Sequence, residues 1–106
     1  MGKYLMGEFE QLVLLAAMRL GAEAYGVSVA KALSEQTGKE VSQAATYLTL
    51  KRLEEKGWLE AEDGVPSTAR AGREKRTYQI TETGLAKIRE SRQTLMRMWD
   101  EVAEQL

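Results

Sequence analysis

The sequence predicts a mainly α-helical protein that carries one small β-ribbon. Apolar residues recur at three- and four-residue steps over four separate stretches of the 106-residue chain, which is the period of amphipathic helices. Between the third and fourth stretches, residues 58–62 and 73–80 alternate in polarity on either side of a loop that contains glycine and proline. This second pattern is typical of two paired strands joined by a loop.

The composition limits the classes of function. Hydrophobic residues make up 43% and charged residues 29% of the chain, an ordinary globular balance for one domain. Cysteine and histidine are absent, which excludes disulfides, thiolate nucleophiles and the usual zinc sites, and no phosphate-binding glycine motif is present. The longest apolar run, Leu12 to Met18, is far shorter than the roughly 18 residues of a membrane helix, and no signal-peptide pattern precedes it. We therefore expect a cytoplasmic protein that is not an enzyme and needs no metal or other cofactor.

Two helices are predicted in the first part of the chain. The first is expected over residues 7–20 and is followed by Gly21, a plausible stop. Its apolar surface is wider than one stripe, so we expect it to be buried against its own domain and against a partner chain. The second is expected over residues 27–36, after an interruption at Tyr25-Gly26, and ends at Gly38.

The third helix is expected to begin after Ser42, a residue that favours the N-cap, and to be closed by Gly57. Thr46, Leu50 and Leu53 share its inward face. The predicted ribbon follows directly, with a strand over residues 58–62, a loop over 63–72 and a return strand over 73–80. A capped helix followed by a ribbon, after two earlier helices, is the order of a winged helix-turn-helix.

The charge is unevenly distributed. The net charge is −1, but residues 67–80 hold four cations and one carboxylate, so that segment carries +3 and the rest carries −4. A basic ribbon on an otherwise acidic protein is what a local contact with nucleic acid requires. An ordinary solvated hairpin is the alternative for the ribbon alone, and its position after a capped helix favours DNA binding.

Seven residues are predicted to contact DNA. The major groove admits one helix, where glutamine pairs with adenine, alanine contacts the thymine methyl group, and tyrosine or lysine reaches the phosphates. The basic side chains of the ribbon are expected to follow the backbone or to enter a narrow minor groove. The predicted contacts are Gln43, Ala44, Tyr47 and Lys51 from the helix and Arg73, Lys75 and Arg76 from the ribbon.

Several motifs together resemble one family. These are G-E-F-E-x-L-V-L-L-A from Gly7, Y-G at Tyr25, S-x-A-A-x-Y-x-T-L-x-R-L-E-x-K-G from Ser42 and G-R-x-K-R-x-Y-x-I-T-x-x-G from Gly72. In this order they are similar to the PadR-like transcriptional regulators over about four fifths of the chain. The resemblance implies a winged helix-turn-helix, a homodimer formed through the C-terminal helix, and repression at an operator that a small molecule often relieves. A single C-terminal helix resembles the short-tailed subfamily.

Three positions depart from the family pattern. Ala44 stands where many members have glycine, Thr46 replaces an apolar residue, and Leu48 stands where proline or a small residue is common. Thr46 is expected to loosen the packing of the core. Leu48 is expected on the outward face, against DNA or exposed to water. These departures concern the operator sequence more than the fold.

The last helix is expected from Glu82 to Leu106, capped by Thr81, a length of 25 residues or about 37 Å. The alternative is that this helix packs back on its own domain, but its length exceeds the width of so small a core. We therefore expect a twofold dimer whose recognition helices lie ~34 Å apart, matching a palindromic operator. Residues 1–80 would form the DNA-binding domain and 81–106 the dimerisation helix, within one continuous structural unit. The expected interface residues are Phe9, Leu85, Ile88, Leu95, Trp99, Val102 and Leu106.

The same helix suggests an effector site. Leu95, Met96 and Trp99 combine adaptable and planar apolar side chains, which suits a small aromatic or cationic hydrophobic effector. The alternative is that they simply fill the dimer interface. For the whole chain, the alternative to a DNA-binding regulator is a winged-helix module that binds a protein partner and no DNA, although such a module has no need of a basic ribbon.

Overall fold

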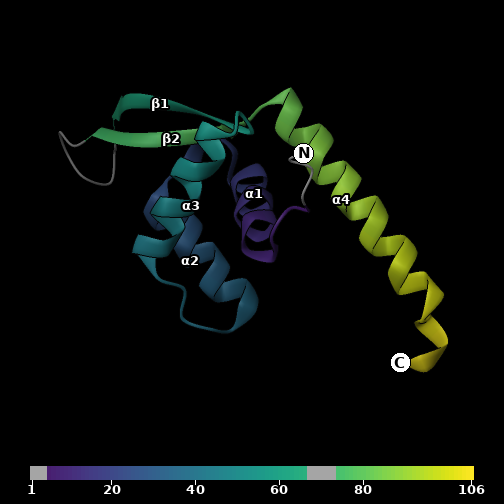
Figure 1. Cartoon of the computed structure of the whole chain (residues 1–106). Helices are drawn as coiled ribbons and strands as arrows, with labels where there is room; N and C mark the ends of the chain where they lie inside the picture. The colour runs from purple at the N-terminus through teal and green to yellow at the C-terminus, as the bar shows by residue number, and fades with distance from the viewer. Residues whose placement is uncertain (1–4, 67–73) are drawn as a thin grey trace.

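The computed structural model describes residues 5–66 and 74–106 and confirms the predicted fold class (Figure 1). Three helices form a bundle, a two-stranded antiparallel ribbon extends from one side of it, and a long fourth helix leaves on the other side. In chain order the elements are α1 (Glu8–Leu20), η1 (Gly21–Glu23), α2 (Gly26–Thr37), α3 (Gln43–Glu55), β1 (Leu59–Pro66), β2 (Glu74–Ile80), α4 (Glu82–Glu101) and η2 (Ala103–Gln105).

The ends of the first two helices lie where the sequence indicates. Gly7 is the N-cap of α1, and its backbone nitrogen donates to Glu10 Oε1 at 3.0 Å. Gly21 and Gly38 follow α1 and α2 with φ of 59° and 72°, values that side chains rarely adopt. Glycine therefore ends both helices because the chain must turn in a conformation that other residues resist.

The core lies where α1, α2 and α3 meet the base of the ribbon. Leu14, Leu50 and Tyr78 are among its largest fully buried side chains. Thr46 is also fully buried, and its hydroxyl donates to Ser42 O at 2.8 Å. Because that hydroxyl is satisfied, the threonine enters the core without an unpaired polar group. The expected loosening of core packing stays a prediction.

An ion pair fastens α1 to the end of α3. Lys56 Nζ lies 2.7 Å from Glu10 Oε2 and 4.8 Å from the centroid of the Trp58 ring. Burial alone would raise the pKa of Glu10, but the hydrogen bonds from Lys56 and the Gly7 backbone, with the charges of Lys56 and Arg52, together outweigh burial and hold that pKa below its ordinary value. The ion pair therefore stabilises the bundle only while Glu10 is ionised.

The ribbon is longer than the sequence predicts. Strand β1 continues through residues 63–66, where a loop is expected from the sequence, and Pro66 still pairs with Glu74. The prediction was wrong because glycine and proline, which usually indicate a loop, lie here within a strand. A register shift between Glu62 and Val65 accommodates the extra residue, and the proline falls at the end of the strand, where its missing N–H does little harm. Strand β2 begins at Glu74, and Arg73 lies outside the described residues.

The segment Ala24-Tyr25 pairs with the edge of β2 that does not face β1. Tyr78 N donates to Ala24 O at 2.9 Å, and Tyr25 forms an isolated antiparallel bridge with Thr77. The sequence indicates only an interruption between helices at this point. Strand β2 therefore lies between β1 and a segment more than fifty residues earlier in the chain, which joins the ribbon to the bundle.

Helix α4 begins as predicted and ends early. Thr81 Oγ1 accepts from Gly84 N at 3.0 Å as the N-cap, but the helix stops at Glu101, where it was expected to reach Leu106. Its 20 residues span about 30 Å, not the expected 37 Å. Val102 leaves the helical conformation and the last residues form the 3₁₀ turn η2, as is frequent at helix C-termini. No helix in the described ranges is long and apolar enough to span a membrane.

We predict that Gly84→Ala destabilises the fold, because a Cβ at this position would collide with the backbone carbonyl oxygen of Trp58 and also lie 3.0 Å from Ile80 Cγ1. A forced shift of this kind costs ~1–3 kcal/mol, measurable as a lower midpoint of thermal unfolding. Gly26→Ala is the matched control, since nothing lies within 4 Å of a Cβ there. Equal midpoints for the two variants would contradict this close packing of α4 on the ribbon.

Candidate nucleic-acid interface

Helix α3 presents one face to the core and the opposite face to solvent. Ser42 Oγ accepts from Ala45 N at 3.1 Å, so the predicted N-cap is confirmed. Thr46, Thr49, Leu50 and Leu53 are buried. The predicted base- and phosphate-contacting residues Gln43, Ala44, Tyr47 and Lys51 are all exposed, with 46% of Tyr47 accessible. The helix therefore leaves these four side chains available to a DNA groove.

Leu48 lies in the middle of the exposed face and is 58% accessible. Side chains on a helix lean toward its N-terminus, so Leu48 leans over the turn that carries Ala44 and Ala45. An apolar strip thus runs along the outward face of α3, with Tyr47 and Lys51 beside it. Such a strip suits the methyl groups of thymine better than the polar edges of other bases.

The ribbon lies beside α3, as Figure 1 shows. Lys75 belongs to β2, where it pairs with Val65, but its side chain lies outside the described part of the structure, as does all of Arg73. Of the three predicted ribbon contacts, only the Arg76 side chain is described. The structure places it toward carboxylates of its own chain.

The Arg76 guanidinium joins α3 and both strands. Its Nη2 donates to Glu54 Oε1 and Oε2 at 3.0 and 2.8 Å, and its Nη1 donates to Asp63 Oδ1 at 2.5 Å. The arginine side chain is 37% exposed, and those of Glu54 and Asp63 are 30% and 70% exposed. Hydrogen bonds to Asp63 and then Glu54 raise the pKa of Arg76, which therefore stays cationic. We call these three residues the Arg76 bridge.

The ribbon's irregularity explains how Asp63 reaches the arginine. Pairing runs from Glu62 opposite Thr77 to Val65 opposite Lys75, so Asp63 and Gly64 together oppose the single residue Arg76. This is a β-bulge, which re-aims side chains on the bulged strand. The sequence has no clear sign of the bulge beyond its glycine, and neither Glu54 nor Asp63 was predicted as a functional residue.

Tyr78 lies under the bridge. It is 1% exposed, and the Arg76 guanidinium carbon lies 5.9 Å from its ring centroid. Burial raises the pKa of Tyr78, and the neighbouring Arg76 acts in the opposite direction. The Tyr78 hydroxyl has no hydrogen-bond partner among the described residues. The ring therefore contributes through packing, and it holds β2 on the bundle directly beneath Arg76.

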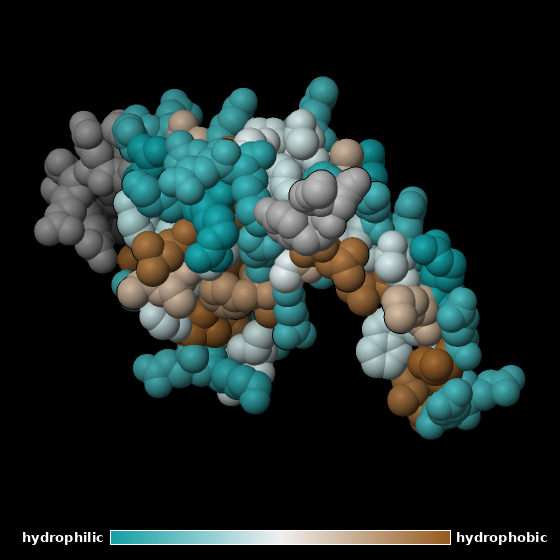
Figure 2. All heavy atoms as spheres, viewed as in Figure 1, coloured by the Kyte–Doolittle hydropathy of each residue, from teal (hydrophilic) through white to brown (hydrophobic). Residues whose placement is uncertain are grey.

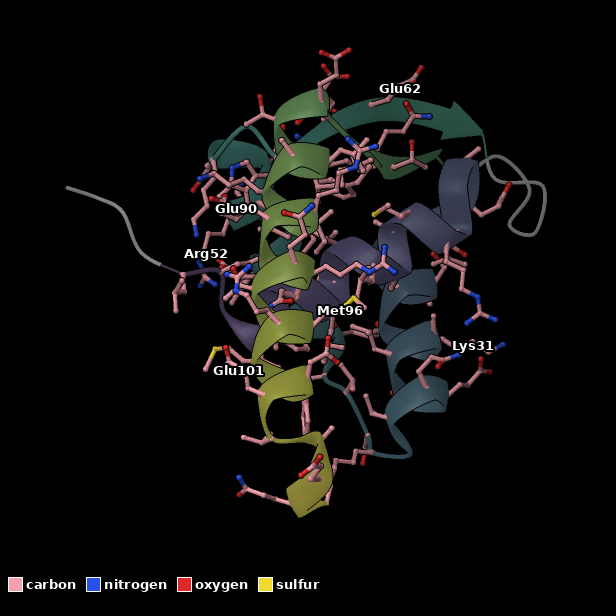
Figure 3. All side chains as sticks on the ribbon, turned by 90° about the vertical axis from the view of Figure 1, so that its right-hand side faces the viewer. Lys31, Arg52, Glu62, Glu90, Met96 and Glu101 are labelled. Atoms are coloured by element: carbon pink, nitrogen blue, oxygen red, sulfur yellow. The ribbon has the colours of Figure 1, made fainter. Side chains whose placement is uncertain are left out.

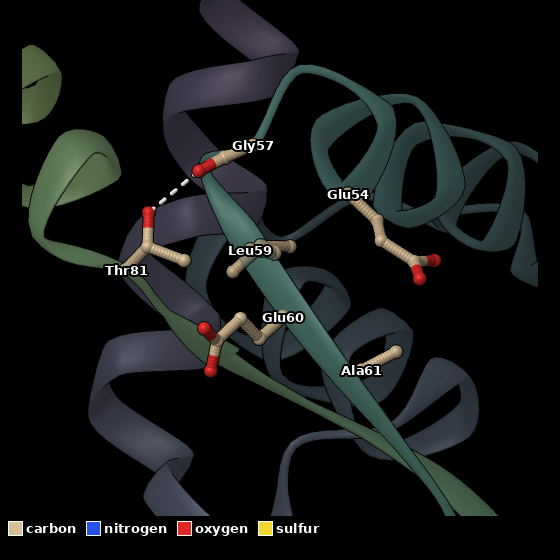
Figure 4. A pocket seen from close by; sticks show the side chains of 6 residues that line it. All are labelled: Glu54, Gly57, Leu59, Glu60, Ala61 and Thr81. Atoms are coloured by element: carbon tan, nitrogen blue, oxygen red, sulfur yellow. Dashed lines mark hydrogen bonds between the residues drawn. The ribbon is translucent and has the colours of Figure 1, made fainter.

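A shallow hollow lies between the end of α3 and β1 (Figure 4). Glu54 and Glu60 supply its charge, and Thr81 Oγ1 donates to Gly57 O at 2.7 Å at its edge. Its lining includes no cation, so it does not suit an anion. No group of three potential metal ligands occurs within residues 5–66 and 74–106.

The apolar side of α4 is largely open to solvent. Leu95, Trp99, Val102 and Leu106 are 43%, 57%, 37% and 83% exposed, and Met96 is 50% exposed. In Figure 2, hydrophobic residues follow the side of α4 that faces the bundle. Figure 3, a view from the α4 side, shows Glu90, Met96 and Glu101 along this helix.

The other predicted interface residues lie closer to the body of the chain. Ile88 is buried, and Phe9 and Leu85 are partly buried against the core. Leu15 and Met18 of α1 are also exposed, at 49% and 39%. The predicted interface is therefore divided between residues that pack within the chain and residues that remain uncovered in it.

Comparison with known proteins agrees with this architecture. The family model "Transcriptional regulator PadR-like family" matches residues 14–90. A PadR family transcriptional regulator from Eggerthella lenta is 26% identical, with a TM-score of 0.70 over 91% of this chain and 79% of that one. No curated protein matches the sequence.

Two further solved structures show the same fold. A PadR-like regulator from Bacillus cereus is 24% identical, with a TM-score of 0.69 over 92% of this chain and 85% of that one. A PadR family regulator from Clostridium difficile is 20% identical, with a TM-score of 0.64 over 89% and 95%.

Proposed function

This chain belongs to the PadR-like family of transcriptional regulators, and we propose that it is a repressor that binds a palindromic operator as a homodimer. Its family makes it a DNA-binding regulator and not an enzyme. The observation that carries the proposal is the exposed face of α3, lined by Gln43, Ala44, Tyr47 and Lys51 and placed beside the ribbon, whose segment 67–80 carries a net charge of +3 in the sequence. We also propose a cytoplasmic location, where such an operator is accessible.

The helix and the ribbon are proposed to divide the work of recognition. The four α3 residues enter the major groove, where Gln43 and Ala44 meet base edges and Tyr47 and Lys51 meet the sugar-phosphate backbone. Arg73 and Lys75 neutralise phosphates from the ribbon. Phosphate neutralisation supplies most of the affinity and all of the salt dependence, whereas base contacts supply sequence discrimination. Arg76, also predicted as a DNA contact, pairs with Glu54 and Asp63 of its own chain.

We predict that Gln43→Ala and Tyr47→Ala reduce the preference for operator over random DNA by ~1–3 kcal/mol. Arg73→Ala and Lys75→Ala should weaken binding to both DNAs and flatten the salt dependence by about 0.9 in slope for each phosphate that is no longer neutralised. The measurement is fluorescence anisotropy with the DNA upstream of the protein's own gene and with random DNA, at two salt concentrations.

Arg97→Ala is the control for this experiment, because it removes a cation from α4, far along the helix from α3 and the ribbon. Equal losses on both DNAs for the two groups of variants would refute the division of labour. Weak, equal and salt-sensitive binding of the wild-type chain to both DNAs would instead favour the alternative, a module that binds a protein partner.

A second copy of the chain is proposed to cover the exposed side of α4. After Ile88, the last buried residue of the helix, α4 extends away from the bundle (Figure 1). Its apolar side chains Leu95, Met96 and Trp99 are exposed to solvent. A long apolar stripe open to water is unfavourable and marks an interface. Residues 81–106 would then serve as the dimerisation helix of a DNA-binding domain formed by residues 1–80, and twofold symmetry would place two copies of α3 on successive major grooves.

We predict that the wild-type protein sediments as a dimer and that Leu95→Glu shifts it to a monomer, because a charge would be buried at the centre of the stripe. Operator affinity should fall at least tenfold with the loss of the second half-site. Arg97→Glu is the matched control, since position 97 lies on the opposite face of α4. A monomeric wild-type protein in analytical ultracentrifugation would exclude this interface.

We further propose that Leu95, Met96 and Trp99 contact a small aromatic or cationic hydrophobic effector that releases the operator. A coupling of ~1–3 kcal/mol would lower operator affinity about 5- to 150-fold. Trp99 is 57% exposed and Trp58 only 9%, so a Trp99→Phe variant assigns any change in tryptophan emission to the proposed site. A panel of such compounds that leaves Trp99 emission unchanged would argue against an effector here. The alternative is that these residues only pack in the dimer.

A further inference from the structure

Arg76 differs from the other predicted ribbon contacts because its guanidinium is occupied by the chain's own carboxylates. We propose that Arg76 is a positioning residue: the Arg76 bridge holds the ribbon at a set angle to α3, so that both reach the same DNA duplex. The proposal rests on the proposed function, because the angle matters only if both elements bind DNA together.

The geometry supports a link between elements. One nitrogen of the guanidinium donates to both oxygens of Glu54 on α3, and the other donates to Asp63 on β1. Arg76 itself belongs to β2, so one side chain joins three elements. The β-bulge brings Asp63 to this point, and the buried Tyr78 ring supports the arginine from beneath. A solvent-exposed arginine that only bound DNA phosphate would need none of these contacts within the chain.

The local charge argues against a phosphate contact. Arg76 with Glu54 and Asp63 carries a net charge of −1, so a phosphate approaching the arginine also meets two carboxylates within 3.0 Å of it. The cations nearer the ribbon's tip are less offset in the sequence, where Arg70, Arg73 and Lys75 are accompanied by one carboxylate, Glu74. We assign the phosphate contacts to those cations and the positioning role to Arg76.

The link joins α3 at a point close to its reading face. Glu54 follows Lys51 by three residues and Tyr47 by seven, so it lies on the same flank of the helix as both. A movement of the ribbon relative to Glu54 is therefore a movement relative to the residues proposed to contact DNA. Besides the bridge, β1 is held by its pairing with β2 and, at its base, by Leu59 and Ala61, which pack on the core. Asp63 lies farther along the strand than these two residues, so the bridge holds the ribbon beyond its base.

The first test needs no DNA. Arg76→Gln removes the whole bridge and Glu54→Gln removes its charged link to α3. Glu55→Gln removes the same charge from the next residue, for which the structure shows no ion pair or hydrogen bond within the described ranges. Hydrogen–deuterium exchange of the β1 and β2 amides should become faster in the first two variants and stay unchanged in the third. Circular dichroism checks that each variant is folded, and Glu54→Gln serves alone if Arg76→Gln does not fold.

The second test uses the sign of the effect on DNA. Glu54→Gln removes a negative charge that competes with DNA phosphate for Arg76. If Arg76 binds phosphate, this variant should therefore bind DNA more tightly than the wild-type protein. A positioning Arg76 predicts weaker operator binding, by roughly 2- to 30-fold, for both Glu54→Gln and Arg76→Gln relative to Glu55→Gln. The double variant should bind no more weakly than Arg76→Gln alone, since the link to Glu54 is already lost in that variant. Arg76→Gln should also keep the wild-type salt slope, unlike Lys75→Ala.

Three results would overturn the proposal. They are exchange rates that do not differ among the variants, operator binding by Glu54→Gln that equals or exceeds that of Glu55→Gln, and a salt slope flattened by Arg76→Gln. A wild-type chain that prefers no DNA would instead count against the proposed function, and the exchange rates alone would then decide whether the bridge holds the ribbon.

Discussion

The burial of Tyr78 is the constraint on which the rest of the structure depends. Its ring is almost inaccessible in the core, and its backbone nitrogen donates to Ala24 O at 2.9 Å. Two residues before it, Arg76 reaches α3, and three residues after it, Thr81 caps α4. Strand β2 can therefore move neither along nor away from the bundle without exposing a large aromatic side chain to water.

The ribbon and α4 extend from opposite ends of this anchored strand. Toward its N-terminal end, β2 leads into the ribbon beside α3, where the Arg76 bridge lies. Toward its C-terminal end, Ile80 and Thr81 lead into α4, whose first turn is held against the ribbon by the close approach of Gly84 to Trp58 O. The bundle thus forms the centre of the fold, and the elements proposed to meet DNA and a second copy extend from it.

The chain places polar and apolar surfaces according to these roles. The core-facing side of α3 is buried, and the Thr46 hydroxyl on that side has a hydrogen-bond partner in Ser42 O. The opposite face of α3 is left available for binding. On α4 the reverse holds, because apolar side chains remain in solvent beyond Ile88. Exposed apolar surface of this extent has a cost in a monomer, and its position on a projecting helix is consistent with a partner that removes it from water.

Local physics made much of this protein predictable from its sequence alone. Periodic apolar residues, the N-caps Ser42 and Thr81 and the stops Gly21 and Gly38 determined the four helices, because each depends on neighbours within a few residues. The outward direction of Gln43, Ala44, Tyr47 and Lys51 follows from helical periodicity once Leu50 and Leu53 are assigned to the core. Whether these residues contact DNA is a proposal that periodicity alone does not test.

Only the tertiary structure decided the contacts between distant segments. The strand through Pro66, the pairing of Ala24-Tyr25 with β2 and the end of α4 at Glu101 each depend on what lies opposite in space, which no local pattern records. Arg76 shows the difference most clearly. Its sequence neighbours are basic and indicate a nucleic-acid contact, but Glu54 lies 22 residues away along the chain and Asp63 lies 13 away. The fold brings both carboxylates to the guanidinium. Ion pairs between residues so far apart in sequence form only because the packing of helix and strands places them together in space.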